Sequence, residues 1–236
     1  QGDSISTRVA AIRAIGQLKA LDLKTEIIGQ LDHDHQAVRR AALKTMWEID
    51  GENAADIFID HTTDTAASVR LVAVQAIGEF DITKGVQAVS KTFLDTNKHV
   101  RQAAVNSLVN IGNEETRSQA ATLLTGDYGP ARACASQALG RLKSSKGLQK
   151  HLKLLHDEYL PARRWSAWAL GEIGSEAASP DLLSIASQKD QDRQVRAAAI
   201  LSMGKLNYKK VLPLCHQLLP QKPTMKSPGV ATAIRV

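Results

Sequence analysis

Seven arginines recur at a nearly constant interval along the chain, and this register constrains the fold more than any other feature. They are Arg8, Arg39, Arg70, Arg101, Arg132, Arg163 and Arg196. Five successive intervals are 31 residues, and the last is 33. A fixed period of this length predicts one supersecondary unit per repeat, stacked into a solenoid in which each unit contacts its neighbours.

The apolar spacing around each arginine predicts an α-helix. With the arginine as position 0, positions −1, +3, +4, +7 and +10 are small or apolar in most units. In the third unit these positions are Val69, Ala73, Val74, Ile77 and Phe80. Spacings of three and four residues mark one face of a helix. A second, shorter apolar run follows in each unit, so two helices and two short turns fill the repeat. We therefore predict an all-α superhelix of about seven 31-residue helical hairpins.

An aspartate precedes each repeat arginine by five or six residues. The set is Asp3, Asp34, Asp64, Asp95, Asp127, Asp157 and Asp190. Aspartate just before a helix is a good N-cap, and a partly buried guanidinium needs an anionic partner. We predict that both sets are structural, with the aspartates capping helices and pairing with arginines of the same or the next unit. Replacing Arg101 by alanine is then expected to leave one of these carboxylates unpaired.

Glycine occupies position +8 in five of the seven units. These residues are Gly16, Gly78, Gly140, Gly171 and Gly204. A glycine at this place either allows neighbouring backbones to approach closely or helps to end the helix, and the sequence leaves both interpretations open.

These runs, of the type Val-Arg-x-x-Ala-x-x-Ala-Leu-Gly with a preceding aspartate, resemble the HEAT-repeat family. They are most similar to the short HEAT-like repeats also found in phycobilisome lyases. The resemblance covers residues 3 to about 219, and it implies antiparallel helices A and B in a right-handed superhelix with the B helices on the concave side. We predict one repeat domain over residues 1–219. Residues 220–236 are expected to be a proline-containing tail or the start of a further, truncated repeat, and the uncapped ends suggest a segment of a longer protein.

Positions +1, +2, +5, +9 and +12 are predicted to point away from the buried face and, by the family's sidedness, to line the inner groove. The candidate partner-binding residues are Arg13, Lys44, Trp47, Gln75, Asn106, Gln137, Arg141, Arg164, Trp165 and Trp168. Trp165 at +2 and Trp168 at +5 stand beside Arg164, a composition typical of binding anchors. The alternative is that both tryptophans fill a gap between adjacent helices. Trp47, which replaces the +8 glycine, is better explained by packing.

The formal charge of +6 is unevenly distributed. Residues 1–118 hold 13 basic and 16 acidic residues, whereas residues 119–236 hold 17 and 8, so the two parts carry −3 and +9. Lys146, Lys150 and Lys153 share one helix face in the basic part. Such polarity can attract a polyanion over long range, although a solvated helix surface explains it as well.

No motif for catalysis, metal or cofactor binding recurs in the chain. The seven histidines form no His-x-x-x-His or His-Glu pair, so we predict neither a metal site nor the activity of the diiron hydroxylases that are built on HEAT repeats. Cys134 and Cys215 lie several units apart, which disfavours a disulfide; unpaired cysteines favour a reducing compartment such as the cytoplasm. No window approaches about 18 uninterrupted apolar residues, so no membrane span is expected.

Three functions remain open on the sequence. The favoured one is a non-catalytic scaffold that binds a partner protein, a peptide or another domain of the same longer chain. The first alternative is binding of nucleic acid or another polyanion through the basic C-terminal half; a glycosylase-like role for Asp157 or Glu158 beside the tryptophans is less favoured. The second alternative, implied by the resemblance, is a bilin lyase-type chaperone, although nothing in the sequence marks a tetrapyrrole site.

Overall fold

The computed structural model describes residues 4–219, and within them it contains fourteen α-helices, short 3-10 turns and no strand. The longer helices are α1 (Ile5–Gln17), α3 (Gln36–Ile49), α5 (Ala67–Glu79), α7 (Lys98–Ile111), α9 (Gly129–Arg141), α11 (Leu160–Ile173) and α13 (Arg193–Lys205). The helices that alternate with them are α2 (Lys24–Ile28), α4 (Ala55–Asp60), α6 (Val86–Lys91), α8 (Glu114–Leu123), α10 (Leu148–Leu154), α12 (Ser179–Ser187) and α14 (Leu212–Leu218). The tail predicted over residues 220–236 lies outside the described residues.

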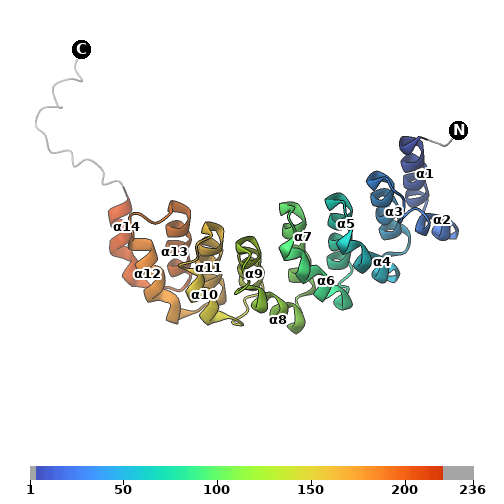
Figure 1. The fold of residues 1–236 in the computed structure, drawn as a ribbon. Helices are drawn as coiled ribbons and strands as arrows, with labels where there is room; N and C mark the ends of the chain where they lie inside the picture. The colour runs from blue at the N-terminus through green and yellow to red at the C-terminus, as the bar shows by residue number, and fades with distance from the viewer. Residues whose placement is uncertain (1–3, 220–236) are drawn as a thin grey trace, which may run out of the picture.

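The helices stack side by side into a curved array, as the sequence predicts (Figure 1). The odd-numbered helices, which carry the repeat arginines, line the inner side of the arc, and the even-numbered helices cover its outer side. This arrangement confirms the all-α superhelix. The arginine-bearing helices correspond to the B helices of the family's hairpin, and they lie on the concave face.

The turn that ends each inner helix has a constant conformation. Each of the seven inner helices is followed by one residue with a left-handed backbone, and in six units this residue stands at position +11. The seven residues are Lys19, Gly51, Asp81, Gly112, Lys143, Gly174 and Asn207. A left-handed residue ends the helix and turns the chain back toward the outer helix. Only three of the seven are glycine, so the sequence pattern does not mark this turn.

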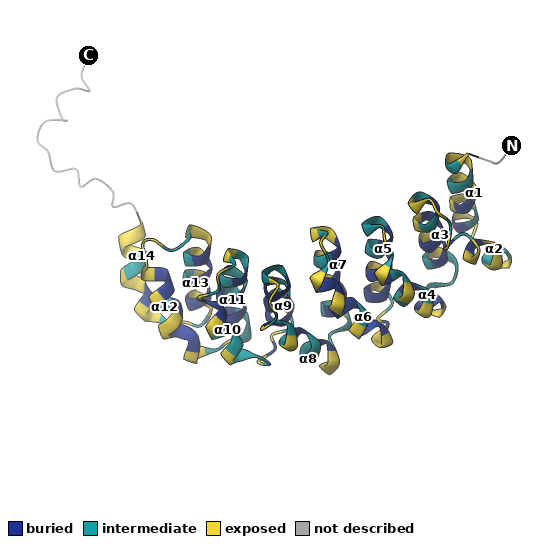
Figure 2. Ribbon diagram, viewed as in Figure 1, coloured by how far each residue is buried: buried dark blue, intermediate teal, exposed yellow. Residues whose placement is uncertain are grey.

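The hydrophobic core runs along the stack between the two layers (Figure 2). Its largest fully buried side chains include Phe58 and Phe93. The buried apolar residues form two clusters, one extending from Ile12 to Leu154 and the other from Leu155 to Val211.

The +8 glycines Gly78, Gly140 and Gly171 allow close approach between neighbouring inner helices, the first of the two interpretations, whereas a Cβ atom at Gly204 would meet nothing within 4 Å. A Cβ atom at Gly78 would lie 2.4 Å from Cα of Ser107, and one at Gly171 would lie 2.7 Å from Cα of Ser202. Trp47 in α3 and Val109 in α7 occupy this position instead. We call the contact between two successive inner helices a joint. The joints of α3 with α5 and of α7 with α9 are less extensive than those at which the first helix carries a +8 glycine.

A hydroxyl side chain at position +6 links several of these helix pairs. The Oγ1 atom of Thr45 donates to the carbonyl oxygen of Ile12 at 3.0 Å, and Oγ of Ser107 donates to that of Val74 at 2.7 Å. Ser202 repeats the bond to Ala167 at 2.8 Å. These buried bonds satisfy hydroxyl groups at the helix contact, and the sequence analysis did not identify them.

Three repeat arginines pair with the aspartate of the following unit. The Nε–carboxylate distances are 2.8 Å for Arg39–Asp64, 2.6 Å for Arg70–Asp95 and 2.7 Å for Arg132–Asp157. Burial raises the pKa of Asp95, but the bonds from Arg70 and from the N–H of Asn97 outweigh it and hold that pKa below its usual range. Arg70 also donates to the carbonyl oxygens of Asp64 and Thr65. The predicted ladder therefore joins consecutive units at these places.

Two details of the ladder prediction are wrong. Arg101 pairs with no carboxylate of the described residues; it donates to the carbonyl oxygens of Asp95 and Thr96 and lies 5.9 Å from the ring centre of Tyr128. Asp127 precedes its arginine by five residues, whereas the three pairing aspartates precede theirs by six, so a one-residue offset accompanies the missing pair. The offset is not the whole reason, because Asp190 also precedes its arginine by six residues and Arg163 pairs with no carboxylate of the described residues.

The aspartates also do not occupy the helix N-cap. Asp64 and Asp95 accept hydrogen bonds from the N–H groups two residues later, those of Ala66 and Asn97. Ala66 and Asn97 are themselves the N-cap residues of α5 and α7. These two aspartates therefore fix the turn before the helix, two residues ahead of the N-cap position at which they were expected.

Candidate partner-binding face

The +5 and +9 rows of the inner helices face the concave side of the arc, as predicted. Arg13, Lys44, Gln75 and Asn106 are exposed, and Gln137 is half-buried. The prediction for position +2 is wrong in most units, because Ala41, Val72, Ala103 and Ala198 are buried. In these units the +2 side chain is covered by its neighbours, although Ala41 and Ala103 still border hollows between the inner helices. Position +12 is likewise buried or half-buried in the turns, as at Ile82 and Ser144.

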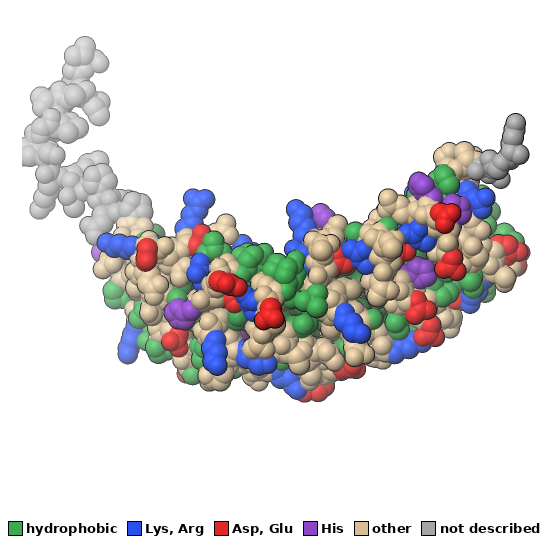
Figure 3. Space-filling view, in the orientation of Figure 1, with side chains coloured by type: hydrophobic (Ala, Val, Ile, Leu, Met, Phe, Trp, Pro, Cys, Tyr) green, Lys and Arg blue, Asp and Glu red, His purple; other side chains and the backbone are tan. Residues whose placement is uncertain are grey.

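An apolar patch stands on this face where α11 meets α13; we call Trp165, Trp168 and Leu201 the aromatic patch. The two indole rings meet edge to face with their centres 5.3 Å apart. Leu201, at the +5 position of α13, is 67% exposed. Figure 3 shows hydrophobic side chains exposed on the inner side of the arc. Leu201 continues the +5 row, but it is not among the residues predicted to bind a partner.

The tryptophans pack between helices and also retain an exposed surface. A Cβ atom at Gly140 would lie 2.6 Å from Cζ3 of Trp168, so this ring covers the glycine of α9. Both tryptophans are nevertheless only half-buried. Filling a gap between helices and offering a surface to a partner, the two interpretations made from the sequence, therefore do not exclude each other.

The basic residues around the aromatic patch have partners within the chain. The guanidinium of Arg164 lies 4.9 Å from the ring centre of Trp165 and donates to Gln194 at 2.9 Å. Lys205 pairs with Glu172. Farther along the face, Arg141 donates to Oδ1 of Asn106 at 2.6 Å. These contacts hold the side chains of Arg141, Arg164 and Lys205 in place without a bound partner.

Trp47 lies in α3, the second inner helix of the stack, and packs as predicted. Its ring meets that of Phe80 edge to face, with the centres 6.1 Å apart. It also borders a hollow of about 250 Å³ with Gln75, Glu79 and Asn106.

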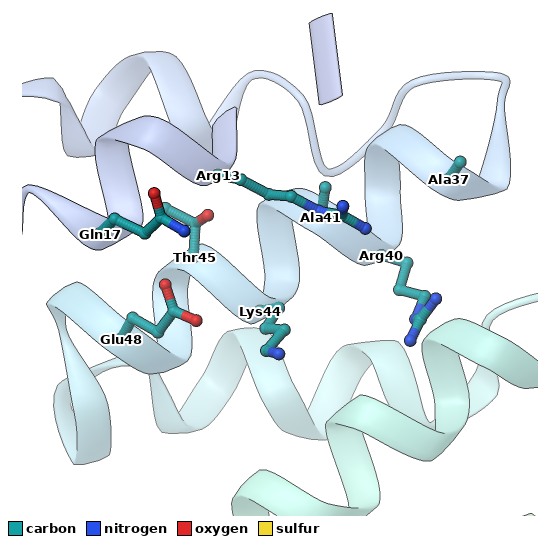
Figure 4. A pocket seen from close by; sticks show the side chains of 8 residues that line it. All are labelled: Arg13, Gln17, Ala37, Arg40, Ala41, Lys44, Thr45 and Glu48. Carbon is teal, nitrogen blue, oxygen red and sulfur yellow. The ribbon is translucent and has the colours of Figure 1, made fainter. Parts of the chain in front are cut away.

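A second hollow, of about 350 Å³, opens between α1 and α3. Figure 4 shows Arg13 reaching from α1 across to Ala41 of α3, while Arg40 and Lys44 project from α3. We call Arg13, Arg40 and Lys44 the cationic hollow. Arg13 and Lys44 are predicted from the +5 row, whereas Arg40, which stands one turn before Lys44 on the same helix, is not among the predicted residues.

Lys146, Lys150 and Lys153 of the basic C-terminal half lie on the outer layer, where two of them join neighbouring units. Lys146 pairs with Glu114 at 2.6 Å, and Lys150 donates to the carbonyl oxygen of Ala121 at 2.8 Å. Lys153 is exposed. Part of the charge that the sequence marks as a polyanion site thus serves contacts between repeats.

Burial shifts the pKa values of two titratable groups, His151 and Cys134. His151 in α10 is fully buried, and burial lowers its pKa to about 4, so the ring is neutral near pH 7. The hydroxyl of Ser166 donates to the His151 carbonyl oxygen at 2.6 Å. Burial raises the pKa of the Cys134 thiol to about 11, and both Cys134 and Cys215 are free. Within residues 4–219, no group of three or more His, Cys, Asp or Glu side chains is placed to hold a metal ion.

Comparison with known proteins agrees with this architecture. HEAT repeats match residues 1–70, 55–133 and 119–193 of the sequence. The chain belongs to the HEAT-repeat family. None of the curated proteins matches the sequence. Among the described helices, none combines the length and the apolar character that crossing a membrane requires.

Several solved structures are similar to this HEAT-repeat chain. The Escherichia coli protein YibA is 16% identical, with 94% of this chain and 83% of that one covered and a TM-score of 0.60. An engineered protein is 17% identical over 79% of this chain and 99% of its own, with a TM-score of 0.52. The CpcE–CpcF complex of phycocyanin lyase from Nostoc is 18% identical over 93% and 91%, with a TM-score of 0.46. The first two likenesses support the fold.

Proposed function

We propose that this protein is a non-catalytic interaction scaffold whose concave face binds a partner protein, a peptide or another domain of the same polypeptide. The observation that carries the proposal is the aromatic patch, where Trp168 and Leu201 interrupt the otherwise polar +5 row and Trp165 lies against Trp168. Large aromatic side chains dominate the energetics of protein interfaces. A row of inner helices also presents a long surface that suits an extended or helical segment.

The geometry of the patch favours a macromolecular partner over a small substrate. The concave face offers separate hollows, of about 350 and 250 Å³, between neighbouring helix pairs. A small-molecule site usually encloses most of its ligand in one cavity. A chain segment, in contrast, can contact several such hollows in succession.

The partner contacts at the aromatic patch require little reorganisation. Trp168 is held against Gly140, and Trp165 is held between Trp168 and the guanidinium of Arg164. Anchors that are already ordered lose less conformational entropy on binding. The exposed side of Leu201 then supplies apolar area that is removed from water when a partner docks.

The test is selection of binders from a random peptide display library, followed by titration of the selected peptides against two matched variants. Leu201→Ser removes an exposed apolar side chain from the patch, and Leu94→Ser removes one, 53% exposed, from the turn after α6 outside the groove rows. We expect Leu201→Ser to weaken the selected peptides about tenfold, and Leu94→Ser to change affinity by less than about twofold.

The readout is tryptophan fluorescence, because Trp165 and Trp168 report on the patch directly; a Trp47→Phe background removes the third tryptophan. Both serine variants should keep the melting temperature of the parent, since each replaced side chain is mostly exposed. Peptides that bind the parent and Leu201→Ser equally, or that lose affinity in Leu94→Ser instead, would disprove the proposal.

A further inference from the structure

The cationic hollow lies on the concave face at the opposite end of the stack from the aromatic patch. Arg13 of α1 and Lys44 of α3 occupy the same +5 position in neighbouring units, and Arg40 stands four residues before Lys44. All three side chains are exposed. The floor of the hollow includes Ala37 and Ala41, whose small side chains leave it open.

These three cations lie together in one hollow and have no partner among the described residues, as is also true of the separate Lys98 and Arg193 on the inner helices. Among residues 4–219, none of them forms an ion pair or a side-chain hydrogen bond, whereas Arg141, Arg164 and Lys205 all do. Like charges four residues apart on one helix, as in Arg40 and Lys44, destabilise that helix. An anion bound between them would remove this repulsion and gain charge-assisted hydrogen bonds.

The surroundings of the hollow favour separate carboxylates over a continuous phosphate chain. Glu48 stands on the wall of the hollow, and Glu79 and Glu172 follow in the same +9 row. A nucleic-acid backbone presents negative charge at every step, so it would meet these acidic residues along the groove. A peptide can place acidic side chains at the hollow and neutral ones beyond it, which is the complementarity that sets specificity at protein interfaces.

From this arrangement we infer that the cationic hollow binds the carboxylates of an acidic peptide segment. The inference rests on the proposed use of the concave face, and it adds the chemistry of the partner. The segment carries Asp or Glu side chains that contact Arg13, Arg40 and Lys44. The same partner reaches the aromatic patch with apolar side chains, so its acidic and apolar parts are separated along its length.

The experiment measures binding of a fluorescein-labelled hexaglutamate peptide by anisotropy at low ionic strength. The variants are Arg40→Gln in the hollow and Lys153→Gln on the outer layer, which remove the same charge from two exposed sites. Arg40→Gln should weaken the peptide about tenfold, as the loss of one charge-assisted contact implies. Lys153→Gln should change the affinity by less than about twofold. An equal loss in the two variants would mean that only net charge matters, and it would overturn the inference.

Two further arms separate the possible outcomes. A six-nucleotide oligothymidylate that binds more tightly than hexaglutamate and is lost in Arg40→Gln would assign the hollow to a polyanion and overturn the peptide inference. Leu201→Ser should leave hexaglutamate binding unchanged, because this probe has no apolar side chain. Failure of hexaglutamate to bind the parent protein therefore overturns the carboxylate inference alone. The role of the aromatic patch is tested separately, by the selection from the peptide display library. Equal melting temperatures of the parent and both glutamine variants exclude loss of fold as the cause.

Discussion

Two neighbouring joints of the stack, α5 with α7 and α7 with α9, are built from the same repeat but hold together differently. At the first, Gly78 admits the backbone of Ser107, the Ser107 hydroxyl bonds to Val74, and Arg70 pairs with Asp95. At the second, Val109 takes the place of the glycine, and Arg101 finds no carboxylate among the described residues. The first joint is correspondingly the more extensive.

The comparison teaches that the cohesion of each joint depends on two sequence details. One is the bulk at position +8, which sets how closely the inner helices approach. The other is the place of the aspartate before the next arginine: the three aspartates that reach the preceding guanidinium all stand six residues before it, and Asp127, which stands five residues before, does not. The repeat period alone specifies neither detail.

The largest expected effect comes from filling the close joint. Gly78→Ala should destabilise the protein by about 3 kcal/mol, because the added methyl group meets Cα of Ser107 and forces the two helices apart. The matched control is Gly204→Ala in α13, where a Cβ atom meets nothing within 4 Å. This control should stabilise the protein by about 0.5 kcal/mol through helix propensity. Urea unfolding measures both values, and equal effects would refute the packing role of Gly78.

Removing the ion pair between Arg70 and Asp95 gives the next largest loss of stability. Arg70→Ala should cost about 2 kcal/mol, because it leaves the largely buried carboxylate of Asp95 without its partner. Arg101→Ala should cost about 1 kcal/mol or less, since it removes only bonds to carbonyl oxygens and the contact with Tyr128. The free energies of unfolding of the two variants test this order. A larger loss in Arg101→Ala would show that the guanidinium–carbonyl bonds, and not the pair, hold the joints.

The dependence of stability on acid pH gives the smallest effect, and it distinguishes Asp95, which is paired, from Asp127, which is unpaired within residues 4–219. The pKa of Asp95 is lowered in the folded protein, so the unfolded chain takes up protons first as the pH falls. The stability that the pair contributes is complete above the ordinary pKa of about 4 and is lost as the pH falls toward the folded pKa. Asp95→Asn should therefore flatten the decline in unfolding free energy between pH 5 and pH 3, whereas Asp127→Asn should follow the parent.

His151 provides an internal reference for that measurement. Its pKa of about 4 lies below the ordinary value of about 6.5, so every variant loses stability as the pH falls between these values. Because this loss is common to the parent and both asparagine variants, it cancels in the comparison. An Asp127→Asn profile as flat as that of Asp95→Asn would contradict the offset explanation.

The sequence predicts the repeat, the helical hairpins and the exposed +5 and +9 rows because each follows from a short period and one buried face. It does not predict the left-handed turns at Lys19 or Asp81, whose residue types are common elsewhere. Position +2 is misplaced because helical angle alone does not reveal that a second inner helix packs beside the first. Leu201 and Arg40 are missed for a different reason: their significance arises only when neighbours from other units lie beside them.

The bulky residues at position +8 have a mechanical consequence. Trp47 and Val109 divide the inner helices into three blocks, the first containing α1 and α3, the second α5 and α7, and the third α9, α11 and α13. Bending of the arc is expected to concentrate at the two compliant joints between blocks. The cationic hollow belongs to the first block and the aromatic patch to the third, so the span between them lengthens or shortens as the arc flexes.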